Sequence, residues 1–289
     1  MSTTKVGEYG GRLCNQIFRL FAVSILAKKH NLHVNYILNR YKSIRDLGII
    51  LYSSDTKKEG VCKSLDDDTM LQIYNSNEKI GSLNVKGQSC FQRKSCSDLI
   101  FENIRSDESK KSIINKNPYK DRYNNNNDCC IHVRLGDVRR WNPGVLYFCK
   151  VLDDLNFDKL YIASDSPNDP IVKEIKNKYE NSEILIKNEI ETIQFASTCK
   201  NVVLSHGTYS GIIGYLSFYS NVYYCKVKTV GWQPVGPWKD KDKLPNCKPG
   251  KWIGIELPEM TEKFENARGA ICKEDLYPGE WRRGDGWAG

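Results

Sequence analysis

The chain has 289 residues, a formal net charge of +8, 40% hydrophobic residues and 27% charged residues. This is an ordinary globular composition, and the length is sufficient for two domains. Lysine and arginine are scattered along the chain, so the positive charge suits a protein that handles small anionic substrates as well as it suits one that binds nucleic acid. Composition therefore leaves the choice between these classes to the motifs.

The N-terminal residues predict a strand, a glycine turn and a helix. The stretch TTKVGEY is β-prone, and in GGRLCNQIFRLFAVSILAKKHNL (10–32) the residues Leu13, Ile17, Leu20, Phe21 and Ile25 form one face of a helix. The turn matches neither G-x-G-x-x-G nor the P-loop pattern. A phosphate-binding role for this turn is therefore not supported by its own sequence.

The same segment argues against a membrane anchor. Its uncharged run covers only residues 20–27 and Arg19 abuts it, whereas a spanning helix needs about 20 apolar residues. A signal peptide is not indicated either, because there is no continuous apolar region followed by a small-residue cleavage site. We expect a cytoplasmic protein without a membrane span.

Strand and helix patterns alternate along the chain and divide it into three parts. A strand near Val6, the helix above and a strand at 33–38 precede less regular polar segments, and the polar stretch NPYKDRYNNNNDCC (117–130) predicts an exposed linker. We predict an N-terminal Rossmann-like domain at 1–127, a nucleotide-binding domain at 128–228 and an extension at 229–289 that packs back on the N-terminal domain.

The second part alternates most clearly, and its pattern predicts a parallel α/β sandwich. The predicted strands are CCIHVRL, KLYIAS, EILI, NVVLS and NVYYCKV, and the predicted helices are PGVLYFCKVLDDL, DPIVKEIKNKY, EIETIQFASTC and YSGIIGYLSFY. Open parallel sheets bind ligands at the carboxyl ends of their strands. We therefore expect the site there, between two sheets that face each other across a cleft.

Metal sites are not indicated. The eleven cysteines include no C-x2-C pair, and the chain has only four histidines, so we expect reduced, buried thiols and no structural zinc. The run Asp66 to Asp68 is the one candidate set of metal-binding carboxylates, as in a transferase that holds a divalent metal. A polar loop with a helix N-cap is the favoured interpretation of this run.

Polar residues follow three strands of the second part. Arg134, Gly136 and Asp137 follow CCIHV, Asp165 follows LYIA, and SHGTYS (205–210) follows NVVL. An arginine presents a fork of donors that suits a diphosphate, and the helix after Gly207 would point its first amides at an anion. An aspartate can hold a ribose or a base edge. These clusters predict a nucleoside diphosphate site without a metal.

Three blocks of the chain resemble one family. HVRLGD (132–137) is similar to the His-x-Arg-x-Gly-Asp motif of the α-1,2-fucosyltransferases of glycosyltransferase family 11 and of related fucosyltransferases. GRLCNQIF (11–18) resembles their N-terminal glycine motif and that of protein O-fucosyltransferases, and residues 191–217 resemble their third block. Cys14 replaces a glycine, and Gly211-Ile212 replaces Trp-Trp.

The resemblance implies a GT-B-like α/β fold with two Rossmann-like domains, an inverting transfer of fucose from GDP-fucose to a glycan hydroxyl, with an α-1,2 linkage favoured, and no metal, cofactor or nucleic-acid partner. It implies that Arg134 contacts the donor's β-phosphate, that His132 supports it and that Asn15 lies near the sugar. With the strand-end clusters it gives these candidates: for the donor His132, Arg134, Gly136, Asp165, Ser205, Gly207, Thr208, Tyr209 and Ser210; for the acceptor side Gly11, Arg12, Asn15 and Gln16; for catalysis Arg134, Asp137 and Asn15.

Several alternatives stay open at this stage. Asp137 is the first candidate for the catalytic base and Glu8 the second, but Asp137 serves equally well as a turn cap. Arg134 could instead pair with Asp137 or Asp165 and only tie the sheet edge together. For the whole chain the alternatives are a non-catalytic nucleotide-sugar-binding module, a transferase with another nucleotide sugar, and a basic nucleic-acid-associated protein.

Overall fold

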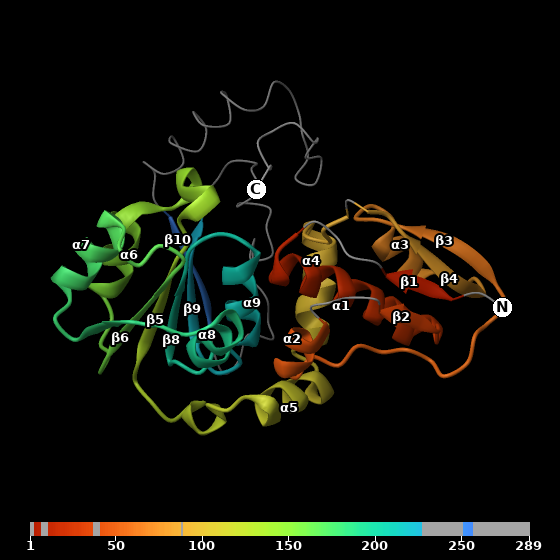
Figure 1. Ribbon diagram of the computed structural model, residues 1–289, viewed down its shortest axis with the longest axis horizontal. Coiled ribbons are helices and arrows are strands. Elements are labelled where there is room, and N and C mark those ends of the chain that lie inside the picture. Colours follow the sequence, from red (N-terminus) through yellow and green to blue (C-terminus); the bar gives the residue numbers. More distant parts are fainter. Residues whose placement is uncertain (1–2, 7–10, 37–40, 88, 227–250, 257–289) are drawn as a thin grey trace.

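The computed structural model describes residues 3–6, 11–36, 41–87, 89–226 and 251–256, and all structural statements refer to these residues (Figure 1). They form two α/β halves that lie side by side. Helices α1 and α4 of the first half pack against α9 of the second (Figure 1). The predicted α/β class is confirmed, and the two packed halves with parallel strands are the arrangement that the predicted GT-B-like class describes.

The N-terminal half is built on short parallel strands: β1 (Thr4–Val6) pairs with β2 (Val34–Tyr36), and β3 (Val61–Leu65) pairs with β4 (Ile80–Val85). The two pairs meet where the Leu83 amide donates to Thr4 Oγ1 at 2.8 Å. The helices are α1 (Leu13–His30), α2 (Tyr41–Asp46), α3 (Met70–Asn75), α4 (Lys94–Ile104) and α5 (Asp107–Lys116). In the described residues this half is thus two small sheets rather than one complete Rossmann-like sheet.

The C-terminal half is one six-stranded parallel sheet with the strand order β10-β9-β8-β5-β6-β7. Its strands are β5 (Cys129–Val133), β6 (Leu160–Ser164), β7 (Ser182–Ile184), β8 (Asn201–Leu204), β9 (Asn221–Lys226) and β10 (Trp252–Glu256). The chain runs outward from β5 through β6 to β7 and then continues on the other side with β8. The topological switch point therefore lies between β5 and β8, where open α/β sheets bind ligands.

The helices of this half match the sequence prediction: α6 (Gly144–Leu152), α7 (Pro170–Lys178), α8 (Glu189–Ala196) and α9 (Thr208–Leu216), with two 3-10 helices, η1 (Lys120–Arg122) and η2 (Gly136–Trp141). Their starts have local causes. Asp169 accepts from the Ile171 amide before α7, and Asn188 and Glu191 form a capping box at α8.

Helix α1 is buried almost all round, which differs from the one apolar face that its sequence predicts. Fourteen of its eighteen residues are buried, among them Arg19, whose guanidinium donates to the Lys86 carbonyl at 2.7 Å. The reason is tertiary: α1 packs against α3 and α4 of its own half and against α9 of the other. No helix among the described residues has both the length and the apolarity needed to cross a membrane.

The two halves share one hydrophobic core. Phe18 and Phe101 of the first half pack against Tyr215 of α9, with ring centroids 5.7 and 4.9 Å away. Trp252 of β10 lies edge-on to Phe101 at 5.8 Å. The Arg105 guanidinium donates across the boundary to the carbonyls of Tyr215 and Phe218, both at 3.2 Å.

The prediction about the segment between the two domains needs correction. The segment 117–130 is not simply an exposed linker, because the buried Asn117 donates to the Gln194 carbonyl at 2.9 Å and Asn126 donates to the Thr198 carbonyl at 2.9 Å. Tyr119 and Tyr123 of the same segment also pack against the core, Tyr119 on Phe195 with ring centroids 5.3 Å apart. Of the predicted 229–289 extension the structure describes residues 251–256, in which β10 adds a strand to the C-terminal sheet and Trp252 contacts Phe101 of the first half; the rest of this predicted segment lies outside the described residues.

Candidate functional site

Arg134 lies directly after β5, at the carboxyl edge of the sheet, and is held by two carboxylates. Its side chain is 14% exposed and donates to Asp165, which follows β6, and to Asp137 in η2. Asp165 also accepts from the Leu135 amide at 2.9 Å, and the buried Asn142 donates to the Arg134 carbonyl at 2.8 Å. The backbone and the guanidinium are thus both fixed, which is the preorganisation that anion binding requires.

Gly136 is needed for this arrangement. Its φ is +29°, and a Cβ there would come within 2.6 Å of Asp165 Oδ2. A larger residue would therefore push the carboxylate away from Arg134.

His132 is buried in β5 and is neutral. Its Nδ1 lies 2.6 Å from the hydroxyl of Ser210, which is itself buried in the first turn of α9. Burial, with smaller contributions from the charges of Arg134 and His206, lowers the pKa of His132 to about 3. The contact joins β5 to α9, so His132 supports the site as a hydrogen-bonding group and not as a cation.

The segment 205–210 connects β8 to α9 and lies at the same carboxyl edge of the sheet as Arg134. Ser205 and His206 are buried, and the Ser205 hydroxyl lies 3.2 Å from His206 Nδ1. Gly207 adopts a φ of +96° as the N-cap, which turns the chain into α9. The Tyr209 hydroxyl donates to the Glu189 carbonyl at 2.6 Å, and its ring lies 5.0 Å from that of His132, centroid to centroid.

The N-terminal half meets this edge at the start of α1. The carbonyl oxygen of Asn15, Oδ1, accepts from the Thr208 hydroxyl at 2.8 Å. Arg12, with a side chain 60% exposed, lies 3.4 Å from Asp137. Gln16 is buried and donates to the Gly11 carbonyl at 3.1 Å, which closes the glycine turn. Arg12 and Asp137 are thus neighbours in space, as are Asn15 and Thr208, although the second pair is 193 positions apart in the sequence.

Two helix N-termini and two ion-paired arginines lie at this meeting point. Helices α1 and α9 both begin there, and helix N-termini present free amides and a positive partial charge. Arg134 and Arg12 add two guanidinium groups, while Asp137 and Asp165 balance them. A diphosphate could take the place of carboxylate oxygens on Arg134, because both are oxyanions of similar geometry.

The structure adds residues to the site that the sequence analysis did not select. Gln92 Nε2 donates to Asn15 Oδ1 at 3.1 Å, and Asp67 accepts from the amides of Cys90 and Gln92 at 3.0 and 3.2 Å. Asn142, described above, is also new. No sequence signal could have found Gln92, because its partner is 77 residues away and the segment between them shows no motif.

The run Asp66 to Asp68 is a polar loop, as favoured, but the N-cap of α3 is Thr69, which forms no side-chain capping bond. Asp66 Oδ1 accepts from the amides of Asp68 and Thr69 at 3.1 and 2.9 Å, and Asp68 pairs with Arg93. Within the described ranges, no group of three or more histidine, cysteine, aspartate or glutamate side chains is placed to hold a metal ion. Six of the nine cysteines in these ranges are buried. Glu8 lies outside the described residues.

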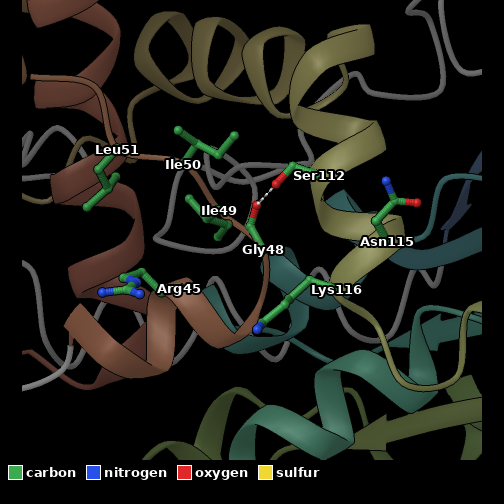
Figure 2. Close-up of a pocket in the computed structure, with 8 residues that line it drawn as sticks. All are labelled: Arg45, Gly48, Ile49, Ile50, Leu51, Ser112, Asn115 and Lys116. Carbon is green, nitrogen blue, oxygen red and sulfur yellow. Dashed lines mark hydrogen bonds between the residues drawn. The ribbon is translucent and has the colours of Figure 1, made fainter.

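An open pocket of about 510 Å³ lies elsewhere, between α2 and α5 of the N-terminal half. Figure 2 shows the Ser112 hydroxyl donating to the Gly48 carbonyl, at 2.7 Å, in the middle of the pocket, while Asn115 points away from it. None of its lining residues belongs to the candidate site. They are Arg45, Gly48, Ile49, Ile50, Leu51, Ser112, Asn115 and Lys116.

The sequence matches no protein-family model and no curated protein. Similar solved structures include NodZ α-1,6-fucosyltransferase soaked with GDP-fucose, at 11% identity and a TM-score of 0.44 over 74% of this chain and 91% of that one. Fucosyltransferase NodZ from Bradyrhizobium has 11% identity and a TM-score of 0.45, over 75% of this chain and 91% of that one. E. coli heptosyltransferase WaaC with ADP-2-deoxy-2-fluoro heptose has 10% identity and a TM-score of 0.46, over 94% of this chain and 100% of that one. At such values the likenesses carry no conclusion about what this chain binds or catalyses.

Proposed function

We propose that the chain is a glycosyltransferase that transfers fucose from GDP-fucose to a glycan hydroxyl, with inversion, without a metal and with an α-1,2 linkage favoured. One observation carries the proposal: the three sequence blocks that resemble fucosyltransferases meet at one place. Asn15 of the first block contacts Thr208 of the third, and Arg12 lies beside Asp137 of the second. His132 of the second block contacts Ser210 of the third.

The proposed roles follow from position. Arg134 and the amides at the start of α9 bind the diphosphate and stabilise the charge that develops on it as the sugar leaves. Asp165 orients the Arg134 guanidinium through the ion pair that the two side chains form. Asn15, Arg12 and the Gly11 turn lie on the side of the sugar and the acceptor.

Asp137 is the proposed base that removes the acceptor proton. It is the exposed carboxylate between Arg134 and Arg12, at the boundary of the two halves. When a diphosphate engages Arg134, the Asp137 carboxylate loses that partner and becomes available to an acceptor hydroxyl. Asp137→Asn should therefore abolish transfer and leave GDP binding intact.

The test has two stages. A thermal-shift screen of nucleotide sugars identifies the donor, because a ligand that binds only the native state raises the melting temperature. GDP-fucose is expected to give the largest shift in melting temperature, and incubation with galactose-terminated oligosaccharides should then release GDP and yield a fucosylated product.

A larger shift and turnover with another nucleotide sugar would overturn the assignment of GDP-fucose as the donor. Binding without turnover on a broad acceptor panel would favour the non-catalytic module. A salt-dependent complex with DNA, and no shift with any nucleotide sugar, would favour the nucleic-acid alternative.

A further inference from the structure

The carboxamide of Asn15 joins three segments of the chain. Its Oδ1 accepts one hydrogen bond from Gln92 Nε2, at 3.1 Å, and one from the Thr208 hydroxyl, at 2.8 Å. Nδ2 lies over the glycine turn, where a Cβ on Gly11 would come within 2.8 Å of it. The two donors therefore fix the oxygen side of the amide and direct its N–H groups toward the turn.

The loop that carries Gln92 is held in an unusual conformation. Phe91 has a φ of +55°, although it is not glycine, and its side chain is fully buried. A bulky residue with positive φ costs free energy and persists only where the surroundings impose it. Such strain next to a residue that reaches the candidate site indicates that the direction of Gln92 matters.

Asp67 holds the loop in the conformation that gives Phe91 its positive φ. Its two carboxylate oxygens accept from the amides on either side of Phe91, Cys90 at 3.0 Å and Gln92 at 3.2 Å. Successive amides that wrap an anion form a concave nest, and here the anion is the protein's own carboxylate. Burial raises the pKa of Asp67, whereas these amide bonds and the charge of Arg93 act in the opposite direction.

We propose that Asp67 and Gln92 are positioning residues that hold the Asn15 amide for the transfer reaction. Asp67 shapes the loop, Gln92 holds Asn15 Oδ1, and the Asn15 N–H groups then face the transferred sugar or the acceptor. The proposal rests on the proposed function, which places Asn15 on that side. An oriented donor lowers the barrier more than it strengthens donor binding, because its bond to the ligand is best formed in the transition state.

Gln92→Leu removes the donor at similar size and is the first test. Loss of one neutral hydrogen bond predicts a kcat about two- to tenfold lower, with KM for the donor and Kd for GDP unchanged. Gln72→Leu, the same change at an exposed position of α3, should match the wild type. In the Asn15→Ala background, Gln92→Leu should cost nothing further, since it acts through Asn15. Additive losses, or a change in KM instead of kcat, would overturn the proposal.

Asp67 is tested by rescue. Asp67→Asn keeps an oxygen for one of the two amides and should retain more of kcat than Asp67→Ala, which keeps neither acceptor, at comparable melting temperatures. Equal losses in the two variants would overturn the role of Asp67.

A spectroscopic measurement keeps this proposal separate from the proposed function. The Asn15 side-chain amide signals, identified by their loss in Asn15→Ala, should shift in Gln92→Leu and stay in place in Gln72→Leu. Unmoved signals would overturn the positioning role at any activity. Shifted signals in a protein that transfers nothing from any nucleotide sugar would contradict the proposed function and leave the hydrogen bond established.

Discussion

The two halves contribute to the candidate site in different ways. In the C-terminal half Arg134, Asp165 and the segment 205–210 each follow a strand of one parallel sheet, next to its switch point. In the N-terminal half Arg12 and Asn15 lie at the start of a helix, where Asn15 is held by Gln92 of a distant loop and Arg12 lies beside Asp137 of the other half. The first wall is set by regular sheet geometry, whereas the second is set by side-chain contacts between remote segments.

This difference predicts a division of labour. The wall on the sheet should bind the donor's diphosphate, because its groups are fixed before the ligand arrives. The wall on α1 should affect turnover more than donor affinity, because it holds the sugar and acceptor side. The following experiments break or sharpen this comparison.

Arg134→Lys should have the largest effect. Lysine keeps the charge but not the fork of donors, so one charged hydrogen bond of about 1.5 to 3 kcal/mol is lost, and GDP affinity should fall roughly ten- to a hundredfold. Turnover should fall further, because the leaving diphosphate gains charge in the transition state. Calorimetry with GDP, turnover and a melt on the same variant measure these three effects.

Arg139→Lys is the matched control, because the side chain of Arg139 is 53% exposed, its ion pair with Asp169 lies outside the candidate site, and the variant should be near wild type. If Arg134→Lys is destabilised but binds GDP normally, Arg134 only ties the sheet edge through Asp137 and Asp165, and the assignment of the donor wall is wrong.

Asn15→Ala should lower kcat about tenfold and leave GDP affinity unchanged, since one donor toward the sugar is lost along with the bond to Thr208. Steady-state kinetics and GDP calorimetry separate the two effects. Asn115→Ala, an exposed position beside the pocket of Figure 2, is the control and should change neither. Unaltered turnover in folded Asn15→Ala would remove the start of α1 from the active site.

The two walls should also respond oppositely to acid. His132 has a folded-state pKa of about 3 against 6.5 unfolded, so its contribution to stability is complete above pH 6.5 and is lost as pH falls toward 3, by up to about 1.4 kcal/mol per pH unit. Burial raises the pKa of Asp67 above 3.8, so its protonation on acidification stabilises the fold. Denaturation at several pH values should show a shallower acid loss for His132→Gln and a steeper one for Asp67→Asn. Identical slopes for all three proteins would contradict the buried environments.

The smallest expected effect is that of metal removal. EDTA should leave turnover unchanged, because the oxygens of Asp66 and Asp67 accept hydrogen bonds from backbone amides instead of facing an open site. Turnover before and after chelation is the measurement. A complete loss that Mn²⁺ restores would return the run Asp66 to Asp68 to the role of a metal site.

Elements of the C-terminal half could be predicted from the sequence because their signals are local. Strands such as Cys129–Val133 and Asn201–Leu204 are short apolar runs bounded by polar residues, and the helices between them have apolar periodicity and capping residues. Parallel strands place their carboxyl ends at one edge, so Arg134 and Asp165 could be expected to meet there.

The N-terminal half was less predictable for the same physical reason. The pattern of α1 indicated one buried face, but the second half covers the other side as well, and no periodicity in a single segment reports a partner that folds elsewhere. The polar stretch 117–130 indicated an exposed linker, yet Asn117 and Asn126 fasten it to the C-terminal half.

The sequence by itself determined the α/β class, the order of elements after residue 128 and the set of chemical groups that the site can use, because these depend on local propensity and on side-chain chemistry. The tertiary structure decided which groups meet. Asn15 lies beside Thr208 and Gln92, and Arg12 lies beside Asp137. Strand β10 joins the C-terminal sheet, and its Trp252 packs in the core that the two halves share. Such contacts depend on how two hydrophobic surfaces pack, and that is a property of the whole chain rather than of any one segment.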